Sequence, residues 1–354
     1  EHEPREHETE GTAILMEIST QRALLLAAQA GDRTAFETLV GPYQRELLAH
    51  CYRLLGSYHD AEDLVQETLL RAWEKRASFT KEGSYRAWLY RIATNLCLNV
   101  LTRSPRRSLP PSTSHKSDPT RPLPKRVSES IWLEPFPGDL EASHESDPEE
   151  KAMRSEHITL AFLVALQQLT PTQRAILLLR DVLDWEAREV AEWLNLSVVA
   201  VNSGLQRARR TLQQPQVLPK AKAALPPSQL QPLLQRYITF WEQADIPGLV
   251  GLMREDAWFT MPPIPAWFQG REEIATLFRT SIFTIPQQWR LLPTHANASP
   301  AFGLYQRNTE TDTYQLFGLL VLGLQGELIA HTVTFLELSS LSPFALPDTF
   351  PPDG

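Results

Sequence analysis

Cysteines and long apolar runs are scarce in this chain of 354 residues. The two cysteines, Cys51 and Cys97, each stand in an apolar helical pattern, which argues against a disulfide framework or a cysteine-rich zinc site and predicts buried thiols. The longest apolar stretch, residues 316–324, is far shorter than the roughly 20 residues of a membrane-spanning helix. The first twenty residues are acidic and lack a signal pattern, so we expect a cytoplasmic protein.

Positive charge is also in short supply, since 34 Lys and Arg against 42 Asp and Glu give a net charge of −8. Nucleic-acid binding needs cations that neutralise phosphates, so this average argues against it. The charges are unevenly spread, however, because acids dominate the N-terminus and residues 141–150. The basic clusters are Arg103, Arg106, Arg107 and then Arg207, Arg209, Arg210. We therefore expect local binding that depends on a larger partner.

Composition and periodicity predict a multidomain chain with two all-α modules followed by an α+β domain. The two modules are separated by a linker rich in proline and serine, and the last domain shows helices first and then strand patterns, as in a curved antiparallel sheet. Inside the linker, "IWLEPFPGDL" at residues 131–140 is too apolar for a plain tether, so we expect it to dock on a folded surface. The predicted segments are an acidic extension (1–20), the first module (21–107), the linker (108–148), the second module (149–213), a short linker (214–229), the third domain (230–340) and a tail (341–354).

The second module has the pattern of a helix-turn-helix. Residues 186–194 predict one helix, Asn195 suits the positive φ of a tight turn, and Ser197 suits the N-cap of the next helix. An ordinary pair of helices with a solvated basic end fits the same pattern about as well. The residues expected near base edges or phosphates of a major groove are Ser197, Val201, Asn202, Gln206, Arg207, Arg209 and Arg210.

Two further patterns stand in the first module. One amphipathic helix carries Asp60, Asp63, Gln66 and Glu67 along one face, which alone would be an ordinary solvated face. Aromatic and basic residues then interleave, and such residues hold melted strands by stacking and by charge. Trp88 and Leu89 fit a core at least as well. The candidate contacts are Phe79, Tyr85, Arg86, Arg91, Asn95, Asn99, Arg103, Arg106 and Arg107.

Both modules resemble parts of the sigma-70 family of transcription initiation factors, of the extracytoplasmic-function (ECF) type. "LQQLTPTQRAILLLRDVLDWEAREVAEWLNLSVVAVNSGLQRAR" looks like sigma region 4, and "HDAEDLVQETLLRAWEKRASFTKEGSYRAWLYRIATNLCLNVLTRSPRR" looks like region 2. The resemblance implies that the first module docks its acidic face on core RNA polymerase and captures the promoter −10 element, with loop 77–84 holding a flipped base. The second module would read the −35 element. Asn202 stands where most such factors have Lys, so no −35 base preference carries over.

The third domain contains "FWEQADIPGLVGLMREDAWFTMPPIPAWFQGREEI", "WRLLPTHANASPAFGLYQR" and "FALP", and these stretches resemble SnoaL-type domains. The resemblance implies an α+β cone-shaped barrel, in which the sheet and helices enclose a pocket. "AVNSxLQRAR" and "WLEPFPGDL" are similar to motifs of a sigma subgroup with such a domain, which implies that the domain tunes sigma activity from high effective concentration. A small-molecule ligand is left open, whereas no cofactor, metal or catalytic residue is expected. Histidines that are simply hydrogen-bonded in the sheet fit His295 and His331 better than acid–base roles. The candidate pocket residues are Asp256, Trp258, His295 and His331.

Two other functions fit parts of the sequence. A one-component regulator would bind a small molecule in the third domain and duplex DNA through the helix-turn-helix, but it leaves the first module unexplained. A SnoaL-like cyclase or isomerase with helical appendages would need a second catalytic partner at recognisable spacing, and none is present.

Overall fold

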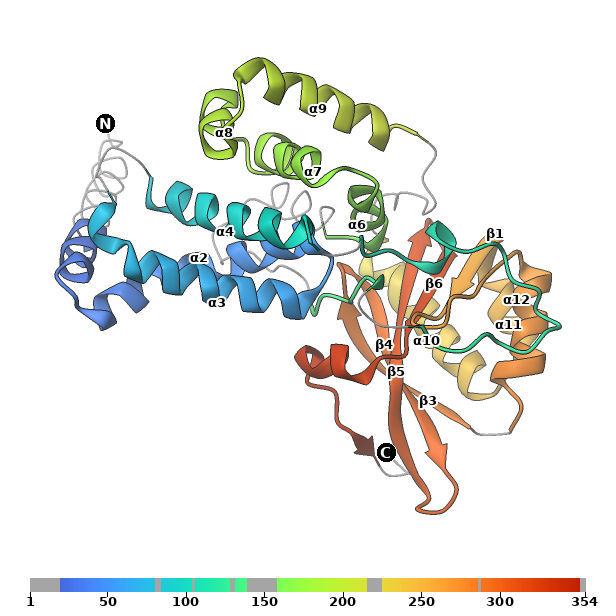
Figure 1. Cartoon of the computed structure of the whole chain (residues 1–354). Coiled ribbons are helices and arrows are strands. Elements are labelled where there is room, and N and C mark those ends of the chain that lie inside the picture. Colours follow the sequence, from blue (N-terminus) through green and yellow to red (C-terminus); the bar gives the residue numbers. More distant parts are fainter. Residues whose placement is uncertain are drawn as a thin grey trace, which may run out of the picture. The chain divides into compact units, whose positions relative to one another are not determined.

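The computed structural model describes residues 20–79, 84–103, 106–127, 131–138, 158–214, 225–285 and 288–350 (Figure 1). They form two compact units. The first holds the described residues up to Tyr52 together with Asp60–Val100, and the second holds Arg53–His59 and the described residues from Leu101 onward. The predictions for the acidic extension, loop positions 80–83, residues 139–157, the break at 215–224 and the last four residues lie outside the described residues.

The first unit is all-helical, as the apolar periodicity predicted. Its elements are α2 (Arg33–Leu55), α3 (Tyr58–Glu74), the short 3-10 turn η1 (Arg76–Ser78) and α4 (Tyr85–Leu101). Cys51 and Cys97 are both buried and free, which confirms the prediction of core thiols. Burial raises the pKa of the Cys97 thiol well above its usual value, so this thiol is a poor nucleophile.

The second unit contains the helix-turn-helix. Its helices are α6 (Leu160–Gln167), α7 (Pro171–Leu177) with the π turn η4 (Leu178–Val182), α8 (Ala187–Leu194) and α9 (Val198–Leu212). Asn195 ends α8 with a φ of 53°, and the Ser197 hydroxyl accepts a hydrogen bond from the Ala200 amide at 3.1 Å. The turn residue and the N-cap are therefore where the sequence placed them.

The third domain belongs to the same unit and is α+β. Its elements are α10 (Pro227–Glu242), α11 (Ile246–Gly251), β1 (Met253–Thr260), β2 (Trp267–Gln269), α12 (Arg271–Leu277), the π turn η5 (Phe278–Ile282), β3 (Trp289–Ala296), β4 (Ser299–Asn308), β5 (Thr313–Gln325), β6 (Leu328–Phe335), the 3-10 segment η6 (Leu338–Phe344) and β7 (Thr349–Phe350). Residues 233–253 are divided between two helices. The first ends because Ala244 takes a φ of 53°, and α11 then begins because the Asp245 carboxylate caps it through the Gly248 amide.

The sheet differs from the prediction in two respects. Its order is β2-β1-β6-β5-β4-β3, with β7 paired to β5, so the two edge strands do not meet and the sheet is open rather than a closed barrel. All pairings are antiparallel except β1 with β6, which are parallel. After β2, the helix α12 and η5 lead the chain to β3 at the other edge of the sheet. Strands β4, β5 and β6 then follow in order, and β6 pairs with β1 in parallel.

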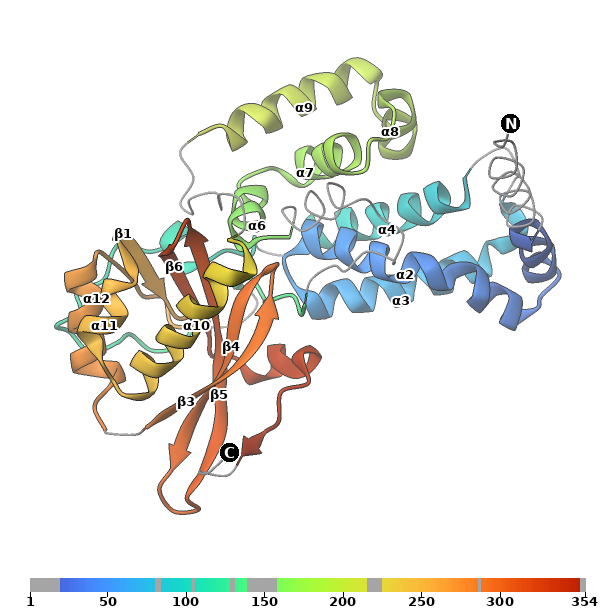
Figure 2. The same ribbon diagram turned by 180° about the vertical axis from the view of Figure 1, so that it is seen from behind.

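One face of the sheet is covered by α10 (Figure 2). Tyr237 and Trp241 of this helix are buried, and Tyr237 stacks on Phe302 of β4 with ring centroids 5.6 Å apart. Phe259 and Phe278 meet edge to face at 5.4 Å in the same core. These aromatics form the hydrophobic core between α10, η5 and the sheet.

The linker packs on the third domain, within the second unit. The amides of Ser117 and Val127 donate to the carbonyls of Trp267 and Pro263 at 2.9 and 3.0 Å. Farther along, the anchor segment (residues 131–138) buries the side chains of Trp132, Leu133 and Phe136 to 4%, 1% and 4% exposure. Docking of this apolar island is therefore confirmed for its described part.

Candidate nucleic-acid and partner interfaces

Helix α3 displays the acidic face expected to bind a partner. Asp63 and Gln66 are exposed, whereas Glu67 is half-buried and forms an ion pair with Arg71 at 2.7 Å. Asp60 is also half-buried. Leu70 lies one turn beyond Gln66 and is 53% exposed. An exposed leucine beside acids on one helix face suits a protein partner, and its helical spacing from Asp63 and Gln66 could have identified it.

Helix α4 carries a polar stripe. Arg91, Asn95 and Asn99 are exposed at intervals of four residues, and exposed Arg103 continues the interval just after the helix ends. Residues four apart lie on one helix face, so Arg91, Asn95 and Asn99 form one cationic and amide surface on α4. Arg103 adds an exposed cation in the chain just beyond the helix. Such a surface can contact phosphates and base edges.

The aromatic candidates near this stripe are packed together instead. Phe79 and Tyr85 are buried, with ring centroids 5.2 Å apart, and Trp88 lies 5.4 and 5.5 Å from them. Burial raises the Tyr85 pKa above its usual range. A base could stack on these rings only after the cluster opened. Arg86 is engaged as well, because its Nε donates to Glu46 at 2.8 Å.

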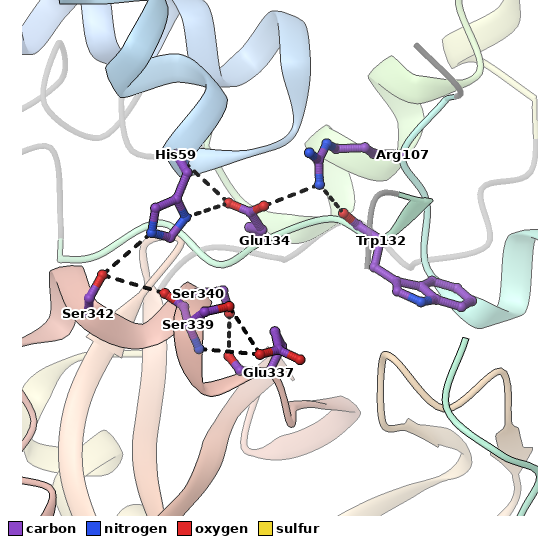
Figure 3. A network of polar contacts seen from close by, with 8 residues as sticks. All are labelled: His59, Arg107, Trp132, Glu134, Glu337, Ser339, Ser340 and Ser342. Atoms are coloured by element: carbon purple, nitrogen blue, oxygen red, sulfur yellow. Dashed lines mark hydrogen bonds and ion pairs between the residues drawn. The ribbon is translucent and has the colours of Figure 1, made fainter. Parts of the chain in front are cut away.

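The two arginines that follow α4 differ. Arg106 is exposed, whereas the Arg107 side chain is only 14% exposed. Arg107 donates to the Trp132 carbonyl at 3.1 Å and to Glu134 Oε1 at 3.2 Å (Figure 3). The Arg107 guanidinium, which was expected to contact DNA, is thus bound to the linker within the second unit.

The recognition helix α9 presents a mixed surface. Asn202, Gln206, Arg207 and Arg210 are exposed, as expected for groove contacts. Arg209 forms a two-point ion pair with Asp181 at 2.9 and 2.7 Å.

Val201 corrects one prediction, because it is fully buried. It lies on the face of α9 that packs on the rest of the module, and a Cβ on nearby Gly204 would come within 2.7 Å of Ile176 Cδ1. Val199, which we did not predict, is 75% exposed in the first turn of α9. Val199, and not Val201, is therefore the apolar side chain that α9 exposes here.

Arg174 is a buried cation that the sequence patterns did not single out. It is 1% exposed, and its guanidinium donates to the carbonyls of Leu54, Leu166 and Leu169. Burial lowers the pKa of Arg174 to about 9. These carbonyls lie at carboxyl ends of α2 and α6, where a cation is favourable, so Arg174 ties the turn 53–59 to the helix-turn-helix.

The four candidate pocket residues of the third domain differ in exposure. Asp256 is exposed and pairs with Arg254 at 2.8 Å, which lowers the Asp256 pKa, and His295 is exposed too. Trp258 and His331 are buried and stacked, 5.1 Å apart. Burial lowers the His331 pKa to about 4, so this imidazole is neutral near pH 7. Two of the four residues are thus exposed and two are buried against each other, and a pocket built from all four stays a prediction.

A cavity of about 50 Å³ lies elsewhere in the second unit. Its walls include His59 and Glu134, together with Pro262, Phe335 and Glu337 of the third domain. Among the described residues, no group of three or more His, Cys, Asp or Glu side chains could hold a metal ion.

None of the described helices combines the length and apolarity that crossing a bilayer requires.

Two family models match this geometry. Residues 39–107 match Sigma-70 region 2, and residues 159–212 match Sigma-70 region 4. The first match covers α3 and α4, and the second covers α6 to α9.

Similar proteins extend the match over most of the chain. The ECF RNA polymerase sigma factor SigG of Mycobacterium tuberculosis H37Rv is 44% identical over 320 residues, which cover 90% of this chain and 85% of the relative. SigW of Bacillus subtilis is 28% identical over 51% of this chain and 89% of its own length. The crystal structure of the M. tuberculosis extracytoplasmic function sigma factor SigJ has a TM-score of 0.59 at 20% identity, covering 89% of this chain and all of that chain, and so shares the fold.

Proposed function

The chain belongs to the sigma-70 family as an ECF sigma factor, and from this membership we propose how its parts divide the work of directing core RNA polymerase to promoters. The α3 face of Asp60, Asp63, Gln66 and Glu67, with Leu70 added, binds core polymerase. Exposed Asp63 offers charge for orientation, and exposed Leu70 offers an apolar contact for affinity.

Promoter recognition is divided between α4 and α9. The α4 stripe (Arg91, Asn95, Asn99 and Arg103) binds the −10 strand, and α9 reads the −35 duplex. The observation that carries this proposal is the capped, exposed N-terminus of α9, because recognition helices present their first turns to base edges. Asn202 and Gln206 suit adenine, while Arg207 and Arg210 suit phosphates or guanine. Val201, Phe79 and Tyr85 are left out because they are buried.

The SnoaL-like domain tunes this activity through the linker, by restraint rather than by chemistry. Asn297 supports this proposal, since its side-chain amide accepts from the Phe136 amide at 3.0 Å and donates to the Ile158 carbonyl at 2.8 Å. One buried residue of the third domain thus holds both the anchor segment and the start of the helix-turn-helix. We infer no catalytic role for the domain, because Asp256 is paired with Arg254 and His331 is buried against Trp258. Its place of action is the cytoplasm, where core polymerase works.

Transcription by core polymerase from a promoter library tests the sigma activity. The full chain should start transcription at a defined promoter class, whereas free chain should bind duplex DNA weakly. Tight binding of the free chain without any initiation would favour a one-component regulator instead.

Asn297→Gly tests the restraint. Asn297 has a φ of 52°, which glycine tolerates, so the change removes the two hydrogen bonds without backbone strain. We expect initiation to rise about fivefold, from loss of roughly 1 kcal/mol of linker docking. The neighbouring Ala298→Gly, also at a φ of 52°, is the matched control and should leave initiation unchanged. Equal output from both variants would argue against the restraint.

A further inference from the structure

The carboxylate of Glu134 sits in a cationic site at the first turn of α3 (Figure 3). Its Oε2 accepts the backbone N–H of His59 at 3.3 Å and lies 3.1 Å from His59 Nδ1, and its Oε1 accepts from Arg107 at 3.2 Å. All of these residues belong to the second unit. A guanidinium, an imidazole and a helix N-terminal amide are the groups with which proteins bind phosphate.

This site is shielded from water. The Arg107 and Glu134 side chains are 14% and 18% exposed, so their ion pair is screened less than a surface pair. The backbone holds the carboxylate in place as well, because the Glu134 amide donates to the Gly56 carbonyl at 3.0 Å. The anionic group in this site is therefore the carboxylate of Glu134, which belongs to the linker.

Arg107 ends the basic cluster that follows α4 in the chain. The proposed function assigns α4 and Arg103 of this cluster to promoter DNA, and the sequence predicts a DNA contact for Arg107 as well, yet Arg107 is bound to the linker. We propose that Glu134 occupies a binding site for a DNA backbone phosphate, formed by the Arg107 guanidinium and by the imidazole and backbone amide of His59, so that the linker and promoter DNA compete for it. This inference rests on the proposed function.

The competition connects the third domain to DNA. Phe136, two residues after Glu134, is held by Asn297, and Leu133 is buried beside Gly56. Docking of the anchor segment thus favours the carboxylate in the site. By linkage, a phosphate that displaces Glu134 must weaken this docking by the same factor.

Salt titration of promoter binding tests the proposal. The full chain in complex with core polymerase is mixed with a labelled promoter fragment that carries a single-stranded −10 region, and affinity is measured over a series of salt concentrations. Glu134→Gln should bind about threefold to tenfold more tightly, because Arg107 is released from a charged partner. The slope of log affinity against log salt should steepen by roughly 0.7 to 0.9, the effect of one added phosphate contact.

Arg107→Gln in the Glu134→Gln background should abolish both changes, and alone it should weaken binding less than in that background. Glu337→Gln is the control, because Glu337 lines the same cavity but accepts from Ser339 instead. Glu134→Ala repeats the test if the glutamine variant folds poorly.

Unchanged affinity and slope in both Glu134 variants, or a gain that persists without Arg107, would overturn the proposal. Failure of the wild-type complex to bind or open any promoter would count against the sigma mechanism itself, so the two failures are distinguishable.

Discussion

Replacement of Gly56 by alanine should loosen the anchor segment. Gly56 lies between α2 and α3 with a φ of 74°, which alanine disfavours. A Cβ there would lie 2.5 Å from Leu133 Cδ2 and 3.1 Å from Gln167 Nε2. The first distance is shorter than any relaxed contact, so Leu133 must move, and Leu133 is one of the buried anchors.

The expected cost follows from these two effects. The left-handed conformation costs alanine about 1–2 kcal/mol, and crowding in a packed site costs about 1–3 kcal/mol. Alanine also restricts the unfolded chain, which offsets about 0.4–1 kcal/mol. We therefore expect Gly56→Ala to destabilise the second unit by about 3 kcal/mol.

Hydrogen exchange of the full chain measures this loss locally. The Glu134 amide reports directly, since it donates to the Gly56 carbonyl, and its protection should fall by about two orders of magnitude. Gly251→Ala is the control, because Gly251 ends α11 in the same unit with nothing within 4 Å of an added Cβ and without a positive φ, so alanine there should leave the protection of the Glu134 amide unchanged.

Leu133→Ala separates the two effects in a double-mutant cycle. It removes the atom that the new Cβ would strike, so the crowding should vanish and a coupling of about 1–3 kcal/mol should remain between the two changes. Full protection of the Glu134 amide in Gly56→Ala, or the absence of coupling, would refute the reasoning.

Two further predictions concern Val199 and His331. Val199→Ala should reduce the preference for thymine over uracil at one −35 position by about fourfold, because the exposed valine would bury one thymine methyl, and an unchanged preference in binding to substituted promoters would exclude this contact. His331 is buried with its pKa lowered from 6.5 to about 4, so between these pH values the unfolded chain binds more protons and stability falls as the pH drops, by about 3 kcal/mol in all. His331→Phe should flatten this part of the stability profile in denaturant titrations, and a profile as steep as wild type would show that other groups cause the acid loss.

Local patterns predicted the secondary structure well. Asn195 and Ser197 were placed correctly because turn and cap chemistry acts over a few residues. The strands β3 to β6 also match their apolar runs. The parallel pairing of β1 with β6 was missed, since strand order depends on contacts that are distant in sequence.

The interfaces could be predicted only in part. The interleaving of aromatic and basic residues placed Arg91, Asn95 and Asn99 among the candidate contacts, and all three are exposed. The sequence pattern did not tell which face of α9 packs inward, and Val201 was misplaced for that reason. The pocket prediction could not separate exposed from buried positions, since Asp256 is exposed and Trp258 on the same strand is buried. Glu134 and Arg107 lie 27 residues apart, so no local pattern could pair them.

The buried linker residues Trp132 and Phe136 have a consequence for the exchange of domains by recombination. Trp132 and Phe136 are almost fully covered, and Phe136 depends on Asn297 of the third domain. A gene that lost the region coding for this domain would encode a protein with a newly exposed apolar patch, which favours aggregation. Recombination should therefore transmit the linker and the third domain as a single cassette, and a hybrid gene that exchanges one without the other should yield poorly soluble protein.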